Sequence, residues 1–466
     1  MRFQMMTCLA LVGIIASAAG APAAAEEPAA AKAPAAANEP ATGPLAEYVA
    51  RADDSYGWVK RREGAIGAGR YIELTLTSQT WKGIVWQHQL FLLLPSGAKA
   101  DCQHGLLYIT GGNWKDEYAQ PPQPNEKLPG EATLFAAVAE RLQTPVAVLK
   151  HCPQQPIFDG LQEDAIIALT FAKYLKTEDP TWPLLLPMTK SAARALDATQ
   201  EVVKKEWKLD LKKFTVSGAS KRGWTTWLTG AIDPRVVAIA PMVIDMLQLD
   251  KQLDLQKTSF GDLSEEVADY KRLKLDEYIN TPRGQKLLEI VDPYRYRDRL
   301  TQPKLIVLGT NDRYWPLDAC NLYWDDLAGE KYLLYCPNNG HGLKDYRRIF
   351  GSLAALQNRM TTGAPLPRLT WRFEPQADRL TLQGQCDVPP SKVLVWRTTA
   401  KTRDFRDSHW SSTTIAASGG KFSCHLETPD QGFSALYAEF VFGDEEETQF
   451  QFCTNVRIVA AKAEKK

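Results

Sequence analysis

Three residues that follow separate strand-like segments have the types needed for nucleophilic acyl transfer. Residues 214–227 read FTVSGASKRGWTTW, in which a β-branched strand is followed by Gly218, Ser220 and a helical pattern. Acyl-transfer hydrolases hold the serine oxygen on a tight turn between a strand and a helix, clear of its own backbone. The turn differs from G-x-S-x-G because Arg222 stands at the second glycine position. We predict Ser220 as the nucleophile, and Ser217, which lies within the strand, as the weaker candidate.

An acid and a histidine follow the next strand-like segments. KLIVL at 304–308 is followed by GTNDRYWP, which places Asp312 just beyond the end of a strand. KYLLYC is followed by PNNGHGL, which places His341 in a glycine-flanked loop. Serine, acid, histidine is the chain order of α/β-hydrolases. We therefore predict that His341 takes the proton of Ser220 and that Asp312 orients the imidazole, with Asp245 as the alternative acid.

Backbone N–H groups at two turns are predicted to stabilise the oxyanion of such a reaction. The third strand-like segment ends as LLYITGGNWKDE, where consecutive glycines let N–H groups face the site, so we predict donors at Gly112, Asn113 and Trp114. The first N–H of the helix after Ser220, that of Lys221, is a further predicted donor. The side chains predicted to contact the substrate are Trp114, Arg222, Trp224 and Trp315.

Alternating strand-like and helical segments between residues 45 and 362 predict an α/β-hydrolase fold with a mostly parallel sheet. Eight apolar runs predict eight strands, at 71–76, 88–94, 106–110, 145–149, 214–217, 236–240, 304–308 and 332–335. Helical patterns occur at 131–142, 163–175, 190–207, 221–230 and 343–359. No helix separates the first two strands, so a hairpin is expected at the sheet edge.

Two further regions surround this core. Residues 245–298 are a charged, mostly helical insertion, which we interpret as a lid, because such sheets bind ligands at the carboxyl ends of their strands. Residues 365–460 lose helical periodicity and predict a small antiparallel, sandwich-like β-domain. Its predicted strands are 369–373, 379–383, 392–396, 422–426, 434–441 and 448–454.

The N-terminus predicts export to the periplasm or the exterior. Residues 1–25 place Arg2 before an apolar stretch and A-x-A cleavage sites, the layout of a secretory signal peptide. Residues 26–44 are rich in Ala, Pro and Glu and predict a disordered linker. The cysteines left after cleavage are odd in number, so at least one lacks a partner within the chain, and the sequence leaves their pairing open.

Composition narrows the classes of ligand. Lysine plus arginine and aspartate plus glutamate number 55 each, which argues against nucleic-acid binding. No apolar run reaches the roughly 18 residues of a membrane span, and no metal-ligand spacing occurs, so we expect no integral membrane association, metal or cofactor. The predicted substrate is a small molecule or a peptide; the oligomeric state stays open. An aminopeptidase needs a carboxylate pair for the substrate amine, and none stands out, which favours an ester over an amide.

Several segments resemble the PhoPQ-activated pathogenicity-related protein family: GASKRGWTTWLT, GTNDRYWPLD, PNNGHGL, LTSQTW, ITGGNW and VDPYRY. The resemblance covers residues 45–440. It implies an exported α/β-hydrolase-like protein with a C-terminal β-domain, and Ser220, Asp312 and His341 as its triad. Bacterial members are associated with a two-component system that senses antimicrobial peptides and low magnesium, which implies a link to that response or to virulence.

The same resemblance keeps a second class of function open. A similar slime-mould protein is a secreted repressor of proliferation, so a non-catalytic signalling or binding protein on a hydrolase scaffold is the alternative, beside a peptidase. The turn around Ser220 also resembles that of glucuronoyl esterases, in which an arginine beside the nucleophile helps to stabilise the oxyanion. That likeness implies that Lys221 or Arg222 assists the reaction.

Overall fold

The structure is a computed structural model and describes residues 41–462. The predicted signal peptide and most of the predicted linker therefore lie outside the described residues. The described chain belongs to one compact unit, residues 35–466. Helix α1, Pro44–Ala50, begins at the last residue of the predicted linker and packs against helix α4, Leu185–Trp207.

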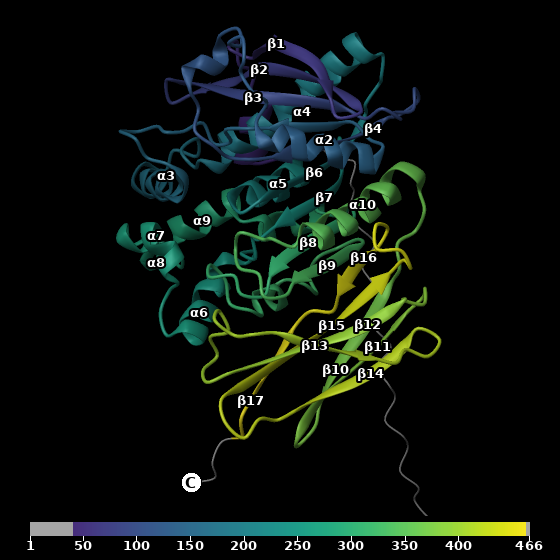
Figure 1. The fold of residues 1–466 in the computed structure, drawn as a ribbon. Coiled ribbons are helices and arrows are strands. Elements are labelled where there is room, and N and C mark those ends of the chain that lie inside the picture. The colour runs from purple at the N-terminus through teal and green to yellow at the C-terminus, as the bar shows by residue number, and fades with distance from the viewer. Residues whose placement is uncertain (1–40, 463–466) are drawn as a thin grey trace, which may run out of the picture. The chain divides into compact units, whose positions relative to one another are not determined.

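A nine-stranded, mostly parallel sheet forms the first part of the described chain (Figure 1). Its strands are β1 Gly57–Ile66, β2 Gly69–Trp81, β3 Ile84–Leu94, β4 His104–Ile109, β5 Val146–Leu149, β6 Lys213–Ala219, β7 Val236–Met242, β8 Lys304–Gly309 and β9 Lys331–Cys336. Their order is β1-β2-β3-β5-β4-β6-β7-β8-β9. All neighbours from β5 to β9 are parallel, whereas β1–β2, β2–β3 and β3–β5 are antiparallel.

The predicted fold class is confirmed, and β2 and β3 form the predicted hairpin, but the strand at the sheet edge is β1. The predicted number of eight strands is wrong, because β1 was missed. Its sequence, GWVKRREGAI, has four charged residues in a row, so apolar and polar residues do not alternate as they do in a typical half-buried strand. The arginines are nevertheless half-buried, because they bind Glu73 and the loop that covers the strand. The inner strands β5 and β8 are buried along almost their whole length and read as continuous apolar runs, as expected where helices cover both faces.

Helices cover the two faces of this sheet. Helices α4 and α5, Lys221–Ile232, pack on one face, while α2, Gly130–Leu142, and α10, Tyr346–Thr362, pack on the other. Helix α4 begins earlier than predicted, since Pro187 lies in its first turn, where proline is tolerated. Helix α10 begins three residues later than predicted, because the Asp345 side chain caps it by accepting from the Arg348 N–H.

The insertion between β7 and β8 is helical, as predicted. It contains α6 Leu249–Phe260, α7 Ala268–Arg272, α8 Leu275–Tyr278, α9 Pro282–Val291 and the 3-10 turns η2 Glu265–Val267 and η3 Pro293–Arg299. Helices α7, α8 and α9 pack against α3, Glu163–Thr177. Two further 3-10 turns, η1 Asp116–Ala119 and η4 Ala319–Leu322, follow β4 and β8.

The C-terminal part of the described chain is antiparallel β structure. One sheet has the order β10-β11-β14, and the other has the order β13-β12-β15-β16 with β17 also paired to β15. The strands are β10 Leu369–Pro375, β11 Arg379–Cys386, β12 Lys392–Ala400, β13 Ser411–Ile415, β14 Lys421–Glu427, β15 Phe433–Phe442, β16 Phe450–Cys453 and β17 Arg457–Ala460. Strand β13, SSTTI, escaped prediction because it is short, polar and mostly exposed.

The seven cysteines of the described chain are all free thiols, six of them buried. None of the described helices combines the length and the apolar character that a bilayer span requires.

Candidate active site

Ser220 lies on the turn between β6 and α5 with φ +59° and ψ −130°, a strained conformation that suits a nucleophile elbow. Its N–H donates to the Met242 carbonyl at 2.9 Å, and its carbonyl accepts from the Trp224 N–H at 3.0 Å. Gly218 is required here, because a Cβ would lie 2.8 Å from the Arg222 carbonyl oxygen. Ser217 is buried in β6 and its Oγ donates to the Ala240 carbonyl, so it is held away from the site.

His341 and Asp312 meet at the ends of β9 and β8. His341 Nδ1 lies 2.9 Å from Asp312 Oδ2 and 3.1 Å from Oδ1, and Asp312 Oδ1 also accepts from the Tyr314 N–H at 2.9 Å. The Tyr314 ring packs on the imidazole with centroids 4.2 Å apart. His341 Nε2 is buried and has no hydrogen-bond partner among residues 41–462. With Nδ1 held by a carboxylate, Nε2 is the nitrogen available as a general base.

Asp245, the alternative acid, bonds elsewhere. Its carboxylate accepts the Tyr323 hydroxyl hydrogen bond at 2.6 Å, and the side chain is buried beside Cys320. Burial raises the pKa of Asp245 to about 8, against weaker lowering by the Tyr323 hydroxyl. A carboxyl group that holds its proton near neutral pH is poorly suited to stabilise an imidazolium, so the geometry favours Asp312.

The loops that carry Asp312 and His341 are tied to each other and to the β-domain. The Asn311 N–H donates to the Asn339 carbonyl at 2.9 Å. Asn311 Nδ2 donates to backbone carbonyls of residues 405, 406 and 408, the shortest of these bonds being 2.7 Å to Ser408. Asn338 makes a two-way bond with Trp410, accepting its N–H at 2.8 Å and donating to its carbonyl at 3.0 Å. Residues 403–410 therefore brace both triad loops, and we call this segment the brace.

The loop after β4 begins beside the Ser220 turn, since Ile109 of β4 is paired with Gly218 of β6. Gly112 has φ +110°, a conformation that other residues rarely adopt. The N–H groups of Gly112 and Asn113 make no hydrogen bond within the described chain, and neither does that of Lys221, at the first position of α5. These three N–H groups stay candidates for oxyanion donors.

The structure contradicts the predicted donor role of Trp114, while its contact with substrate stays a prediction. Its N–H donates to the Gln155 carbonyl at 2.8 Å, so it is not free for an oxyanion. Its ring packs edge-on against Tyr118 and His151, with centroids 5.7 and 5.8 Å away, and it does not line the pocket beside Ser220. Loop packing accounts for this tryptophan.

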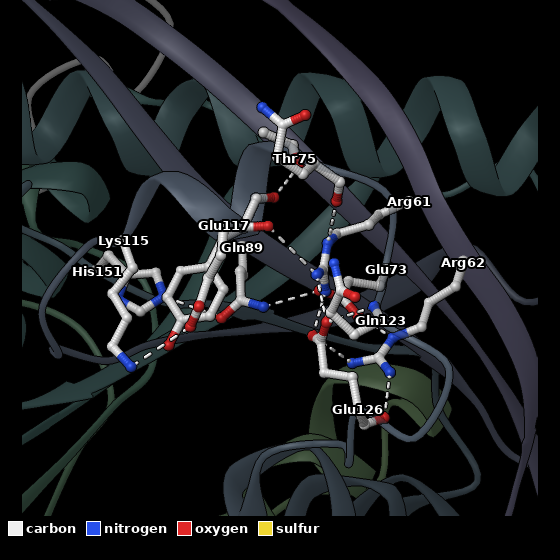
Figure 2. Close-up of polar contacts among 12 residues, drawn as sticks. Arg61, Arg62, Glu73, Thr75, Gln89, Lys115, Glu117, Gln123, Glu126 and His151 are labelled. Carbon is white, nitrogen blue, oxygen red and sulfur yellow. Dashed lines mark hydrogen bonds and ion pairs between the residues drawn. The ribbon is translucent and has the colours of Figure 1, made fainter.

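Figure 2 shows how the loop after β4 is anchored on the first strands of the sheet. Arg61 of β1 bridges Glu73 at 2.8 Å and Glu126 at 2.5 Å, and its Nε donates to the Gln120 carbonyl at 2.8 Å. Arg62 binds the same two carboxylates. Residues 117–126 are thereby held against β1 and β2.

The same network reaches the start of that loop through buried side chains (Figure 2). Gln89 Nε2 donates to Glu73 at 2.7 Å, and Gln89 Oε1 lies 3.0 Å from His151 Nε2. Burial, with the charge of Lys150, lowers the pKa of His151 to about 4, so its ring is neutral and Nε2 is the donor. The His151 N–H donates to the Gly111 carbonyl at 3.0 Å, which fixes the residue before Gly112.

A compact set of paired charges lies under the nucleophile turn. Arg222 makes a two-pronged bond with Glu163 at 2.7 and 2.8 Å, and its Nε donates to the Cys152 carbonyl. Lys221 Nζ lies 2.9 Å from Glu163 and 3.2 Å from Asp164. Burial raises the pKa of Glu163, but the hydrogen bonds and charges of Arg222 and Lys221 outweigh it and lower that pKa to about 2.

The structure disagrees with the prediction that Arg222 contacts the substrate, because its guanidinium is buried and is bound to Glu163 and to the Cys152 carbonyl. Glu163 and Asp164 were not predicted as part of the site. They form an adjacent pair of carboxylates. The sequence signal that could have identified them is their position at the start of a predicted helix, directly after a loop. Their partner could not be found from the sequence, because Arg222 lies 59 residues beyond Glu163.

Ser220 and His341 line one pocket together with the predicted substrate contacts Trp224 and Trp315. Trp224 is fixed by its Nε1, which donates to the Val291 carbonyl at 2.5 Å, and its ring packs edge-on against Phe171. Within residues 41–462, no group of three or more His, Cys, Asp or Glu side chains is placed to hold a metal ion.

A family model for the PhoPQ-activated pathogenicity-related proteins matches residues 45–406. The chain belongs to this family. The resemblance predicted from the motifs is thereby confirmed. This PhoPQ-related family member is also 31% identical over 457 residues to autocrine proliferation repressor protein A of Dictyostelium discoideum, covering 89% of the chain and 90% of the relative.

The solved structures similar to this PhoPQ-related protein include esterases of the α/β-hydrolase fold. An acetyl xylan esterase from Paenibacillus sp. R4 is 13% identical with a TM-score of 0.48, covering 69% of this chain and 92% of its own. Acetyl xylan esterase 1 from a Thermoanaerobacterium species is 16% identical with a TM-score of 0.45, covering 69% and 95%. A glucuronoyl esterase from Solibacter usitatus is 13% identical with a TM-score of 0.42, covering 67% and 91%.

Proposed function

We propose that this protein is an exported serine hydrolase that cleaves a carboxylic ester through an acyl-enzyme. The observation that carries the proposal is the arrangement around His341. Its Nδ1 is held by Asp312 at 2.9 Å, its Nε2 has no partner among the described residues, and it lines one pocket with Ser220. A nucleophile on a strained elbow, a free base and an orienting acid are the parts that acyl transfer requires.

The proposed reaction has two steps. Ser220 Oγ bonds to the carbonyl carbon while His341 Nε2 takes the hydroxyl proton, and Asp312 stabilises the imidazolium. The carbon–oxygen bond to the alcohol then breaks, and the alcohol leaves with that proton. Water repeats the sequence on the acyl-enzyme, which releases a carboxylic acid and restores Ser220. The N–H groups of Lys221 and of Gly112 or Asn113 are the proposed donors to the oxyanion.

An ester is favoured over a peptide by the state of the acidic pair beside the site. Glu163 and Asp164 are the carboxylates that an aminopeptidase would need for a substrate amine. Both are already paired with Lys221, and Glu163 also with Arg222. The proposed export rests on the predicted signal peptide, which lies outside the described residues.

A secreted signalling protein is the second candidate, favoured by the 31% identity to a protein named as an autocrine proliferation repressor. The two candidates differ in what Ser220 does. Signalling by binding alone survives the change Ser220→Ala, whereas hydrolysis does not.

Hydrolysis of p-nitrophenyl butyrate by the mature protein tests the proposal. We expect Ser220→Ala to lower kcat at least about 10³-fold, because triad residues act as a unit. Ser217→Ala is the matched control, a serine three residues away in β6, and is expected to retain the wild-type rate. Equal rates for the wild type and Ser220→Ala would overturn the proposal.

A further inference from the structure

The pocket beside Ser220 and His341 has apolar walls. The helical insertion and its neighbours supply most of them, through Phe171, Trp224, Leu253, Leu263, Leu287 and Leu288. Leu287 and Leu288 are buried in α9, whereas Leu253 of α6 and Leu263 are partly exposed and face the pocket. A group bonded to the reacting carbonyl would therefore leave water for hydrocarbon surface, which is favourable only if that group is itself apolar.

The charged side chains at the base of this pocket are satisfied by one another. Lys221 Nζ lies between Glu163 and Asp164, and Asp164 also accepts hydroxyl hydrogen bonds from Tyr270 at 3.1 Å and Tyr314 at 3.3 Å. A substrate charge could bind here only by breaking a partly buried ion pair, and leaving the buried Lys221 ammonium unpaired is unfavourable. A substrate carboxylate at Lys221 and a substrate amine at Asp164 are both disfavoured.

Asp276 of α8 is the other carboxylate among the lining residues, and it is partly exposed to solvent. Water screens a charge in that position, so its attraction for a substrate cation is small. An ammonium group is nevertheless the charged occupant that a test must compare with an uncharged one.

Either half of an ester, the acyl group or the alcohol, could occupy this pocket. Helices α7, α8 and α9 pack against α3, and each of them contributes residues to the lining of the pocket. The alcohol must leave before water attacks, whereas the acyl group stays bonded to Ser220 through both steps. We infer, on the basis of the proposed hydrolase function, that this pocket binds an uncharged, apolar acyl group of several carbons.

Esters that share p-nitrophenol and differ in acyl length test the inference. From acetate to hexanoate, kcat/KM is expected to rise about threefold to fourfold per methylene, the value of a buried CH₂. The p-nitrophenyl ester of 6-aminohexanoate, which has the same chain length and an ammonium group, is expected to react more slowly than the hexanoate. A rate that is flat or falls with acyl length, or a faster amino ester, would overturn the acyl assignment while leaving the hydrolase proposal intact.

One pocket variant and one matched control connect the effect to this site. Leu253→Trp fills the pocket and is expected to lower the hexanoate-to-acetate ratio of kcat/KM at least tenfold. Leu273→Trp makes the same change at an exposed leucine of the same insertion and is expected to leave the ratio unchanged. Equal ratios in the wild type and Leu253→Trp would place the acyl group elsewhere.

Binding without catalysis provides a second readout, which separates this inference from the proposed function. Hexanamide is expected to bind Ser220→Ala more tightly than acetamide or 6-aminohexanamide, with a change in the fluorescence of Trp224 and Trp315. Leu253→Trp in the same background is expected to abolish the difference. Equal affinity for the three amides would overturn the inference even if esters are hydrolysed, and selective hexanamide binding would support it even if they are not.

Discussion

Asp245 and Asp312 follow neighbouring strands, β7 and β8, yet their surroundings give them different chemistry. Asp312 faces His341 Nδ1 and also accepts a backbone N–H, so its carboxylate is held where the reaction needs it. Asp245 faces the Tyr323 hydroxyl in a buried environment that favours its protonated form. The distinction is made by side chains that come from elsewhere in the chain, so the sequence left both acids open.

Amide substitutions at these two positions separate their roles. Asp312→Asn is expected to lower kcat about 10³–10⁴-fold, because an amide cannot stabilise the imidazolium and favours the wrong tautomer. Asp245→Asn is expected to keep kcat within about threefold of the wild type, since the protonated carboxyl that it replaces is already neutral. Steady-state kinetics on p-nitrophenyl butyrate measure both, and the reverse pattern would make Asp245 the triad acid.

The raised pKa of Asp245 predicts that the free energy of unfolding depends on pH. Its pKa is about 8 in the folded state and about 3.8 when unfolded, so between these values only the folded chain keeps the proton. The free energy of unfolding therefore falls as pH rises through this window, with a slope of up to about 1.4 kcal/mol per pH unit. Asp245→Asn removes that contribution.

Urea unfolding of the wild type and Asp245→Asn at pH 5, 6 and 7 checks this expectation. The stability of the variant relative to the wild type is expected to increase with each step in pH. A constant difference would show that Asp245 is ionised in the folded protein at all three values.

At the scale of elements, the loop after β4 depends on β1 for its position. Arg61 and Arg62 hold residues 117–126 through Glu73 and Glu126, and the buried chain from Glu73 through Gln89 to His151 fixes Gly111 (Figure 2). Strand β1 is thus both the strand that the sequence pattern missed and one support of the proposed oxyanion loop. Its charged residues look like those of a solvated segment until the loop that covers them is known.

Arg61→Lys tests this support. A lysine keeps the charge but cannot bridge two carboxylates and a carbonyl at once, so the loop loosens. We expect kcat to fall about tenfold with little change in KM, because one oxyanion donor is worth about 10²–10³-fold and a loosened loop loses part of that. Arg70→Lys, at an exposed arginine of β2, is the control. A rise in KM with an unchanged kcat would place the effect on substrate binding instead.

The sequence predicted the elements that are repetitive and buried, and it missed contacts between distant segments. Strands such as β8, with its apolar run KLIVL, and the turn carrying Ser220 are local patterns. The sequence analysis predicted that Arg222 contacts the substrate. It could not identify Glu163 as the partner of the guanidinium, because Glu163 lies 59 residues away and nothing in the local pattern connects the two. Trp114 was misassigned for the same reason, since its partners Gln155 and His151 belong to a later loop.

Across the described molecule, the β-domain is part of the support of the catalytic loops. The brace binds the acid loop through Asn311 and the histidine loop through Asn338, and Arg403 pairs with Asp318 at 2.5 Å. Arg406 reaches the insertion through Glu265 at 2.5 Å. One segment of the β-domain thus contacts both triad loops and the insertion that lines the pocket.

Asn338→Ala tests this coupling. It removes the two partly buried hydrogen bonds to Trp410, each worth about 0.5–1.5 kcal/mol in the free energy of unfolding. We also expect kcat to fall, because the histidine loop loses its contact with the brace. Asn358→Ala, at an exposed position of α10, is the control for both measurements. Unchanged kcat with lowered stability would limit the brace to a structural role.

The central claim is that Ser220 is an activated nucleophile. Labelling of the mature protein with a fluorophosphonate probe, followed by peptide mapping, tests it most directly. The account predicts a covalent adduct on Ser220, which is absent from Ser220→Ala, greatly slowed in His341→Ala and retained in Ser217→Ala. A folded wild-type protein that remains unlabelled, or an adduct on another residue, would contradict the account.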